Sequence, residues 1–226
     1  METEITLQDL LKRKSVRSYK DIALTQGNID AIKSLFGSIH NISVKLDWKI
    51  STDSPVGAGS IYAKVEDKDN DNLVDYGFQG QQILMLLFVN DYGTCWMAKS
   101  PEKNVPAVIT FGVPKDKSSL KSSIFRYISQ GDDRKPLDKL YEKNVEDLNE
   151  NQKKLLETIR WSPSSLNKQP WKFKFTEEGK KLILKSNSPI NLGIALSNAY
   201  MAALSIFGKA KVEKVEDNVY ALTVRE

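Results

Sequence analysis

The feature that most constrains the fold is a repeat, because the second half of the 226-residue chain follows the pattern of the first. Residues 48–50 (Trp-Lys-Ile) align with residues 171–173 (Trp-Lys-Phe), and this alignment brings other segments into correspondence. The paired segments are the apolar stretches 75–90 and 192–201, the helical patterns 26–37 and 147–161, and the strand patterns 107–113 and 219–225. A repeat with a period near half the chain length predicts two copies of one unit packed about a pseudo-twofold axis.

Each unit is expected to combine helices with strands. Residues 43–51 alternate apolar and polar side chains, which is typical of a half-buried strand, whereas 75–90 becomes almost wholly apolar from Ile83 onward, as in a buried central helix. The pattern predicts an α+β fold, with a mixed, mainly antiparallel sheet flanked by helices, present twice. The polar stretch 115–133 separates the copies, so we expect halves at 1–133 and 134–226 that pack as one globular unit.

The composition excludes several classes of protein. The net charge of +4 is spread along the chain without a stripe of basic and aromatic residues, so no nucleic-acid partner is expected. The longest uninterrupted apolar run, Ile83 to Val89, is far shorter than the ~20 residues of a membrane-spanning helix, and no signal-peptide pattern opens the chain. We therefore expect a cytoplasmic protein with no membrane partner. One cysteine, Cys95, and one histidine, His40, argue against a disulfide framework and against a metal site.

Residues 162–173 concentrate two prolines and several short polar side chains just before an apolar strand pattern. Pro163 removes a backbone donor, and Pro170 favours an extended backbone at the residue before it. The polar side chains could read the edge of a flat heteroaromatic ring. They are Ser164, Ser165, Asn167 and Gln169. On loop chemistry alone, an ordinary turn from a helix into a strand explains this stretch equally well.

A second candidate segment lies near the start of the chain, where residues 13–17 read Arg-Lys-Ser-Val-Arg. Arg13 and Arg17 can each offer a guanidinium fork to a phosphate, with Ser15 as a neutral donor and Lys14 as a point charge. Alternatively, the basic cluster ends a helix and interacts with its macrodipole. That alternative accounts for Arg13 and Lys14 but leaves Arg17 unexplained.

These two segments, together with residues 92–96 (Tyr-Gly-Thr-Cys-Trp), resemble the flavin-dependent nitroreductase family, in particular members that fuse two units in one chain. The resemblance implies bound FMN, NAD(P)H as electron donor, and ping-pong reduction of a nitroaromatic, quinone or other electron-poor small molecule. It implies no catalytic protein residue, because the flavin carries the chemistry. The cofactor-binding residues that it implies are Arg13, Lys14, Ser15, Arg17, Thr94, Cys95, Trp96, Arg134, Pro163, Ser164, Ser165, Asn167 and Gln169.

The order of the motifs departs from the family, because Arg17 and Ser162 lie 145 positions apart instead of a few tens. The repeat explains this departure if the family's dimer is folded into one chain, with the first motif from one copy and the loop from the other. The matching positions, 41–46 and 134–137, lack both motifs, so we expect one site. Because the fused arrangement already forms the dimer interface within one chain, we also expect a monomer. Arg134 is either a relic of the duplicated motif or a further phosphate ligand.

Two other functions stay open at this level. One is a flavin-binding protein without turnover, which would hold FMN that NAD(P)H reduces poorly. The other is a cofactor-free scaffold of the same fold, which would be colourless when purified.

Overall fold

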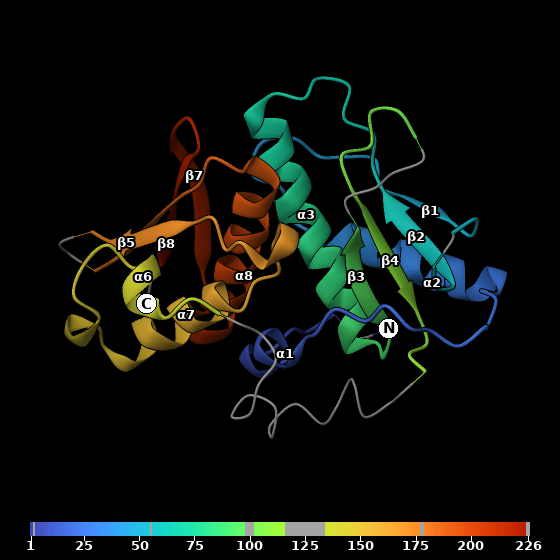
Figure 1. Ribbon diagram of the computed structural model, residues 1–226, viewed down its shortest axis with the longest axis horizontal. Helices are drawn as coiled ribbons and strands as arrows, with labels where there is room; N and C mark the ends of the chain where they lie inside the picture. Colours follow the sequence, from blue (N-terminus) through green and yellow to red (C-terminus); the bar gives the residue numbers. More distant parts are fainter. Residues whose placement is uncertain (2, 55, 98–101, 116–133, 177–178, 225–226) are drawn as a thin grey trace.

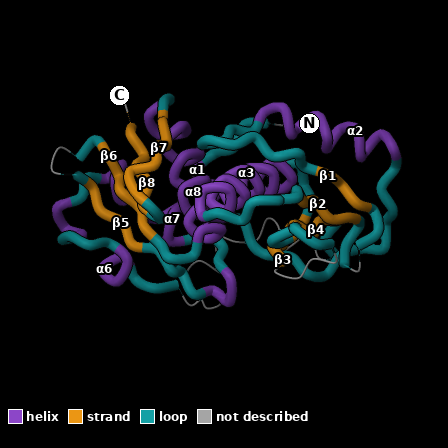
Figure 2. The backbone as a smooth tube through the Cα atoms, turned by 90° about the horizontal axis from the view of Figure 1, so that it is seen from above, coloured by secondary structure: helices purple, strands orange, loops and turns teal. Residues whose placement is uncertain are grey.

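Two four-stranded antiparallel sheets flank a central pair of long helices, α3 (Asn70–Val89) and α8 (Pro189–Phe207) (Figure 1). Figure 2 shows the same arrangement from above, with the two helices between the sheets. The computed structural model describes residues 1, 3–54, 56–97, 102–115, 134–176 and 179–224. The predicted α+β class with mainly antiparallel strands is confirmed. Most of the predicted connector at 115–133 lies outside the described residues, and the boundary between the halves stays a prediction.

The two sheets have the same strand order. The first is β1-β2-β4-β3, formed by Lys49–Ser51, Gly59–Tyr62, Val108–Gly112 and Gly93–Met97. The second is β5-β6-β8-β7, formed by Lys172–Phe175, Lys181–Lys185, Val219–Val224 and Ala210–Glu216. In each case the long helix follows the second strand of the unit along the chain. This agreement in topology is what the predicted duplication requires.

The central helices approach each other through two glycines in corresponding positions. A Cβ on Gly77 would lie 2.1 Å from the carbonyl oxygen of Ile190, and a Cβ on Gly193 would lie 2.0 Å from that of Val74. Gly77 and Gly193 are 116 positions apart, and so are Val74 and Ile190. The contacts are therefore reciprocal, as expected at an interface between equivalent elements related by a twofold axis.

The other helices among the described residues are short. They are α1 (Leu7–Lys12), α2 (Gln26–Leu35), η1 (Phe36–Ser38), α6 (Leu137–Leu140), η2 (Val145–Asp147), α7 (Glu150–Arg160) and η3 (Ser165–Asn167). Capping boxes open α1 at Thr6, α2 at Thr25 and α7 at Asn149. Reciprocal hydrogen bonds of this kind satisfy backbone donors that a helix start leaves open, which explains why these short sequences form helices.

The predicted strand at 43–51 is wrong for most of its length, because only Lys49–Ser51 forms strand β1. The carboxylate of Asp75 on α3 accepts hydrogen bonds from the main-chain N–H groups of residues 42–44 and from the Ser43 hydroxyl. The amide of Gln79, one turn along α3, binds the Leu46 N–H and the Val44 carbonyl. Buried side chains of the central helix thus occupy the backbone groups that a strand partner would need.

We expect Asp75→Asn to lower the free energy of unfolding by about 2 kcal/mol, because the new amide turns donors toward buried backbone N–H groups. Asp75 is 1% exposed, so water does not replace the lost hydrogen bonds. Urea unfolding followed by circular dichroism measures the effect. Asp47→Asn is the control, because the Asp47 side chain is 87% exposed and should change stability by less than about 0.5 kcal/mol. Equal losses in the two variants would contradict the structural role of Asp75.

Two chain segments outside the sheets lie parallel to edge strands. Ser15 forms a parallel bridge with Thr94 of β3, and Tyr141 forms one with Phe173 of β5. These bridges give each sheet a mixed character at one edge. The segments of Ser15 and Tyr141 therefore lie at non-equivalent edges, since β3 ends the first sheet opposite β1, whereas β5 corresponds to β1.

Helix α8 has the length and composition of a membrane span, with a mean hydropathy of 1.5 in its most apolar window. However, 72% of that window is buried inside the fold. The apolar sequence is thus accounted for by packing between α3, α7 and the second sheet, as expected for a core helix.

Candidate functional site

The structure brings the two predicted motifs together at one cavity of about 550 Å³, hereafter the shared cavity. Ser15 and Arg17 from the first motif line it together with Pro163, Ser164 and Ser165 from the loop. Trp96 and Met97 of β3 and Ile190 and Ile194 of α8 add apolar walls; Leu73, Pro106, Ala107, Leu166, Ser188, Pro189 and Asn191 complete the lining. The cavity lies in the size range of small-molecule sites, with mostly apolar walls and a few polar groups.

The first motif reaches the cavity as an extended segment beside β3. The Val16 N–H donates to the Thr94 carbonyl at 2.9 Å, and the Val16 side chain lies against the backbone at Gly93, where a Cβ would come within 2.8 Å. Since side chains alternate along an extended chain, burying Val16 leaves Ser15 and Arg17 on the opposite, exposed face. Sequence spacing therefore explains why these two residues lie on one face, and the position of the segment beside β3 brings both to the cavity.

Arg13 and Lys14 do not line the shared cavity. Arg13 follows α1 as its C-cap and is 7% exposed, so it lies within the fold. Two further predicted residues on β3 are also buried: Thr94 is 0% and Cys95 1% exposed. The Thr94 hydroxyl has no hydrogen-bond partner among the described residues, while the Cys95 thiol faces the Trp96 carbonyl at 3.3 Å. Of this strand segment, only Trp96 and Met97 reach the cavity wall.

The loop after α7 has an unusual backbone. Leu166, Asn167 and Gln169 have φ values of 51°, 53° and 45°, in the left-handed region that residues other than glycine rarely adopt. Leu166 is also 85% exposed, at the rim of the cavity. Strained backbone persists only where the surrounding contacts hold it, and such sites are often functional.

Gln169 holds this loop in place and does not line the cavity. It is 1% exposed; its side-chain oxygen accepts the Lys135 N–H at 2.9 Å, and its N–H group donates to Asn167 O at 3.1 Å. Its main-chain N–H also donates to the Ser164 hydroxyl at 2.9 Å. Asn167 is not among the cavity residues either. Gln169 therefore shapes the loop from inside, whereas Asn167 is exposed and accepts the Gln169 side-chain N–H at its main-chain oxygen.

Arg134 lies beside the start of the loop. Its guanidinium donates to the Ser162 carbonyl at 2.7 Å and stacks over the Trp161 ring, 5.4 Å from the centroid. It does not line the shared cavity among the described residues. Ser15 lies along β3, whereas Arg134 contacts the loop before β5. Both alternatives for Arg134, a relic of the duplicated motif or a further phosphate ligand, stay predictions.

Sequence reasoning missed Asn191, which lines the cavity and supports the loop. Its side-chain oxygen accepts the Ser165 N–H at 3.0 Å. On α3, the Asp75 carboxylate accepts the Ile42 N–H at 2.7 Å. Asp75 and Asn191 are 116 positions apart, the spacing of the paired glycines, so the repeat alignment contained a signal for Asn191. Asp75, however, binds three consecutive N–H groups with its carboxylate and holds residues 42–44 against α3.

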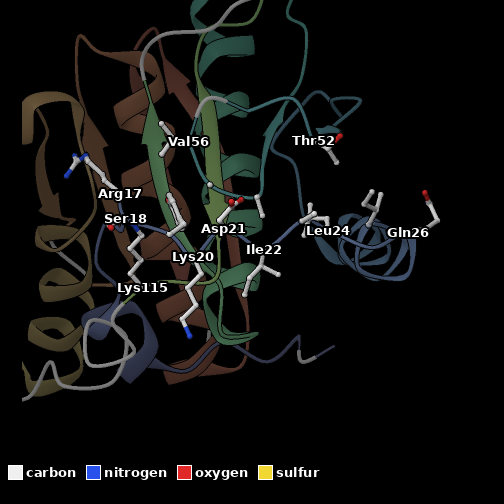
Figure 3. Close-up of a pocket in the computed structure, with 15 residues that line it drawn as sticks. Arg17, Ser18, Lys20, Asp21, Ile22, Leu24, Gln26, Thr52, Val56 and Lys115 are labelled. Atoms are coloured by element: carbon white, nitrogen blue, oxygen red, sulfur yellow. The ribbon is translucent and has the colours of Figure 1, made fainter.

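A second cavity of about 780 Å³ shares Arg17 with the shared cavity (Figure 3). It is lined by residues 17–24 and by parts of 52–58, with Lys20, Asp21 and Lys115 as charged groups. Arg17 lines both cavities, and Figure 3 shows its side chain at one side, apart from Leu24 and Gln26. The arginine thus stands at the junction of the two cavities.

Tyr19 anchors the segment between these cavities. Its hydroxyl donates to the Val16 carbonyl and lies 3.3 Å from the Thr110 hydroxyl. Burial raises the pKa of Tyr19 to about 12, against a partial lowering by the hydrogen bond with Thr110. The neutral phenol is therefore the form that the fold requires.

We expect Tyr19 to make the fold sensitive to alkaline pH. An unfolded tyrosine ionises near pH 10, so the contribution of neutral Tyr19 is complete below pH 10 and is lost as the pH rises through about 12. Between pH 10 and about 12, the free energy of unfolding should fall less steeply with pH in Tyr19→Phe than in the unaltered chain. Urea unfolding at a series of pH values measures both slopes. Parallel slopes would show that Tyr19 is not the responsible group.

Among the described residues, no group of three or more histidine, cysteine, aspartate or glutamate side chains could hold a metal ion. The lining of the shared cavity, as far as the structure describes it, contains one charged side chain, Arg17. The positive charge of Arg17 therefore favours an anionic group in a cavity whose other walls are neutral and mostly apolar.

Comparison with known proteins identifies the family. The family model described as "Putative TM nitroreductase" matches residues 6–203. A crystal structure of a putative nitroreductase from Thermotoga maritima is 35% identical, with 100% of this chain and 97% of that chain covered and a TM-score of 0.86. None of the curated proteins compared with the chain matches it.

Two more distant structures cover part of the chain. A nitroreductase family protein from Clostridium novyi is 19% identical over 54% of this chain and 92% of its own, with a TM-score of 0.38. A protein from Bacteroides thetaiotaomicron named as a putative NADH dehydrogenase/NAD(P)H nitroreductase is 18% identical over 65% and 96%, with a TM-score of 0.42. The family model and the 35% identical structure, which span most or all of the sequence, show that this chain belongs to the putative TM nitroreductase family and is an oxidoreductase of the nitroreductase type.

Proposed function

We propose that the chain is an FMN-dependent oxidoreductase that takes electrons from NAD(P)H and reduces a nitroaromatic, a quinone or another electron-poor small molecule. The observation that carries this proposal is the shared cavity, where Arg17 and Ser15 meet Ser164 and Ser165 from a loop about 145 positions away in the sequence. Family membership supports the reaction type, and the cavity supports the cofactor.

The residues present fit FMN. The dianionic phosphate could accept two hydrogen bonds from the guanidinium of Arg17 and one from the hydroxyl of Ser15. The bonds from arginine would be the stronger ones, because both partners are charged. The apolar surfaces of Trp96, Ile190 and Ile194 suit a flat ring system. Hydroxyl and main-chain groups of the loop suit the polar edge of that ring.

The other predicted residues would act behind this lining. Arg13 and Lys14 would add positive potential near the phosphate, and Arg134, held on Ser162, would add more beside the loop. Thr94 and Cys95 would carry the strand that Ser15 lies along. Asn167 and Gln169 would keep the loop in its strained form.

Bound FMN would supply hydride chemistry in a ping-pong cycle, first with NAD(P)H and then with the acceptor. The contribution of the chain is to bind the phosphate, orient the ring between the two halves and keep water from its apolar walls. The described lining of the cavity contains no carboxylate, histidine or thiol, so any proton that the acceptor needs would come from solvent. Cys95 is buried with its thiol on a backbone carbonyl, which argues against a nucleophilic role.

We further propose one flavin per chain and a monomeric, cytoplasmic protein. In the first copy, Asp75 occupies the N–H groups of segment 41–46 that a second ligand would need. The reciprocal contact of α3 and α8 already supplies, within one chain, the kind of interface that a dimer would otherwise form. A reducing compartment suits the free thiol of Cys95.

The visible absorption spectrum tests the function directly. Protein titrated with FMN should turn yellow at one flavin per chain and should bleach when NADPH is added without oxygen. Flavin that binds but stays oxidised would indicate a protein without turnover. Protein that ignores FMN would overturn the proposal, and two flavins per chain would overturn the single-site argument.

A further inference from the structure

A chain of buried hydrogen bonds leads from the shared cavity through both central helices. Trp96 Nε1 donates to Gln81 Oε1 on α3 at 3.0 Å, and Gln81 Nε2 donates to Asn198 Oδ1 on α8 at 2.9 Å. Asn198 Nδ2 then donates to the Thr158 carbonyl on α7 at 3.1 Å. Gln81 is 0% and Asn198 1% exposed, so this amide relay is closed to water.

The two ends of the amide relay fix the orientation of both amides. An indole N–H can only donate, so Gln81 must turn its oxygen toward Trp96 and its NH2 group toward Asn198. A main-chain carbonyl can only accept, so Asn198 must turn its NH2 group toward Thr158 and its oxygen toward Gln81. Both requirements are met at once, which leaves a single hydrogen-bonding arrangement.

The amide relay connects two parts of the lining of the shared cavity. Trp96 is part of the cavity wall on β3. At the other end, the Thr158 carbonyl also accepts the Ser162 hydroxyl at 3.3 Å, and Ser162 begins the loop whose next residues line the cavity. The position of the indole is therefore tied through α3 and α8 to the base of the loop.

Helix α3 also contacts the indole directly beside Gln81. A Cβ on Gly80 would lie 2.5 Å from Trp96 Cη2 and 2.8 Å from Trp48 Cη2. The glycine lets the ring lie against the helix backbone, and Gln81 then sets its in-plane orientation through Nε1. Gly80 and Gln81 are consecutive on α3, and they thus fix both the distance of the ring from the helix and its in-plane orientation.

We propose that Gln81 and Asn198 are positioning residues of the shared cavity. They hold the Trp96 indole as a rigid wall for the flat ligand and keep the position of that wall fixed relative to the loop. The part of this proposal that concerns ligand affinity rests on the proposed function, whereas the part that concerns the indole does not. A preorganised wall strengthens binding because the ligand does not have to order it.

The test compares Gln81→Met with Gln82→Met. Both remove a buried amide of equal size from neighbouring positions of α3, at 0% and 4% exposure. Gln82 binds the main chain of His40 and Phe78 and does not line the shared cavity, so Gln82→Met controls for the loss of buried hydrogen bonds. Two readouts are used: the nitrogen-15 NMR signal of the Trp96 indole N–H, assigned with Trp96→Phe, and the dissociation constant for FMN from flavin fluorescence.

In Gln81→Met we expect the Trp96 indole signal to shift and its hydrogen exchange to become faster, with FMN binding weakened about tenfold, the equivalent of one lost hydrogen bond. Gln82→Met should leave the indole signal in place and FMN affinity within about twofold. In a Trp96→Phe background, which lacks the indole donor, adding Gln81→Met should weaken binding by less than about twofold.

An indole signal unchanged by Gln81→Met would overturn the proposal, as would equal weakening of FMN binding by the two methionine variants. If the unaltered chain binds no FMN, the proposed function fails, and the indole signal alone decides whether the amide relay positions Trp96.

Discussion

Gly193→Ala is expected to destabilise the fold by about 3 kcal/mol, at the upper end of what overpacking a core costs. The added Cβ would lie 2.0 Å from the Val74 carbonyl oxygen and 2.7 Å from the Phe78 nitrogen. Both are backbone atoms of α3, so no side chain can move aside, and the two central helices must separate. Because the same substitution favours an isolated helix by about 1 kcal/mol, the net loss understates the cost of the lost packing.

Urea unfolding of the purified variants, followed by circular dichroism, measures this effect. Gly77→Ala should be equally damaging, since its Cβ would meet the Ile190 carbonyl at 2.1 Å in the reciprocal contact. Gly27→Ala is the matched control on α2, where the nearest atom to a new Cβ is 3.9 Å away. It should leave stability unchanged or raise it by up to about 1 kcal/mol. A harmless Gly193→Ala would mean that α3 and α8 do not touch through their backbones.

Arg17→Ala is expected to weaken FMN binding about 100-fold, because a hydrogen-bonded charge pair contributes about 1.5–3 kcal/mol. Arg17 is the charged side chain among the described residues of the shared cavity, so no neighbour in that lining can take over its role. The dissociation constant, measured by flavin fluorescence, should also rise with ionic strength in the unaltered chain and do so less in the variant.

Two further variants separate the guanidinium fork from its charge. Arg17→Lys keeps the charge but loses the fork, so it should bind FMN more weakly than the unaltered chain and more tightly than Arg17→Ala. Lys20→Ala removes a cation three positions along the same segment, which lines the second cavity and not the shared one. It should change FMN affinity by less than about threefold. If Lys20→Ala weakened binding as much as Arg17→Ala, general charge and not a specific contact would explain the affinity.

The local sequence pattern was sufficient to predict features that depend on residues close together in the chain. The alternation at residues 15–17 gives one face carrying Ser15 and Arg17, and the structure places both in the shared cavity. The apolar segments that predict buried helices become α3 and α8. Pro163 and the serines after it form a loop that lines the same cavity.

Other features depend on contacts between distant residues and could not be read from local pattern. The alternation at 43–48 is as regular as in a true strand, yet Asp75 and Gln79 bind its backbone from α3 and prevent pairing. Gln169 has the chemistry of a ligand contact, but Lys135 and Asn167 engage its amide inside the loop. In both cases a buried partner elsewhere in the chain decides where the hydrogen bonds go.

The class of fold follows from the sequence, because periodicity and residue type express which groups must be buried. The repeat and the two candidate binding motifs are predictions from the same sequence patterns. The tertiary structure alone shows which motif residues face the cavity and which support it. It also reveals the contact between Gln81 and Asn198, which lie 117 positions apart and match no sequence motif. The physical reason is that a buried polar group is placed by whichever partner satisfies it, and that partner is chosen by the packing of α3 against α8.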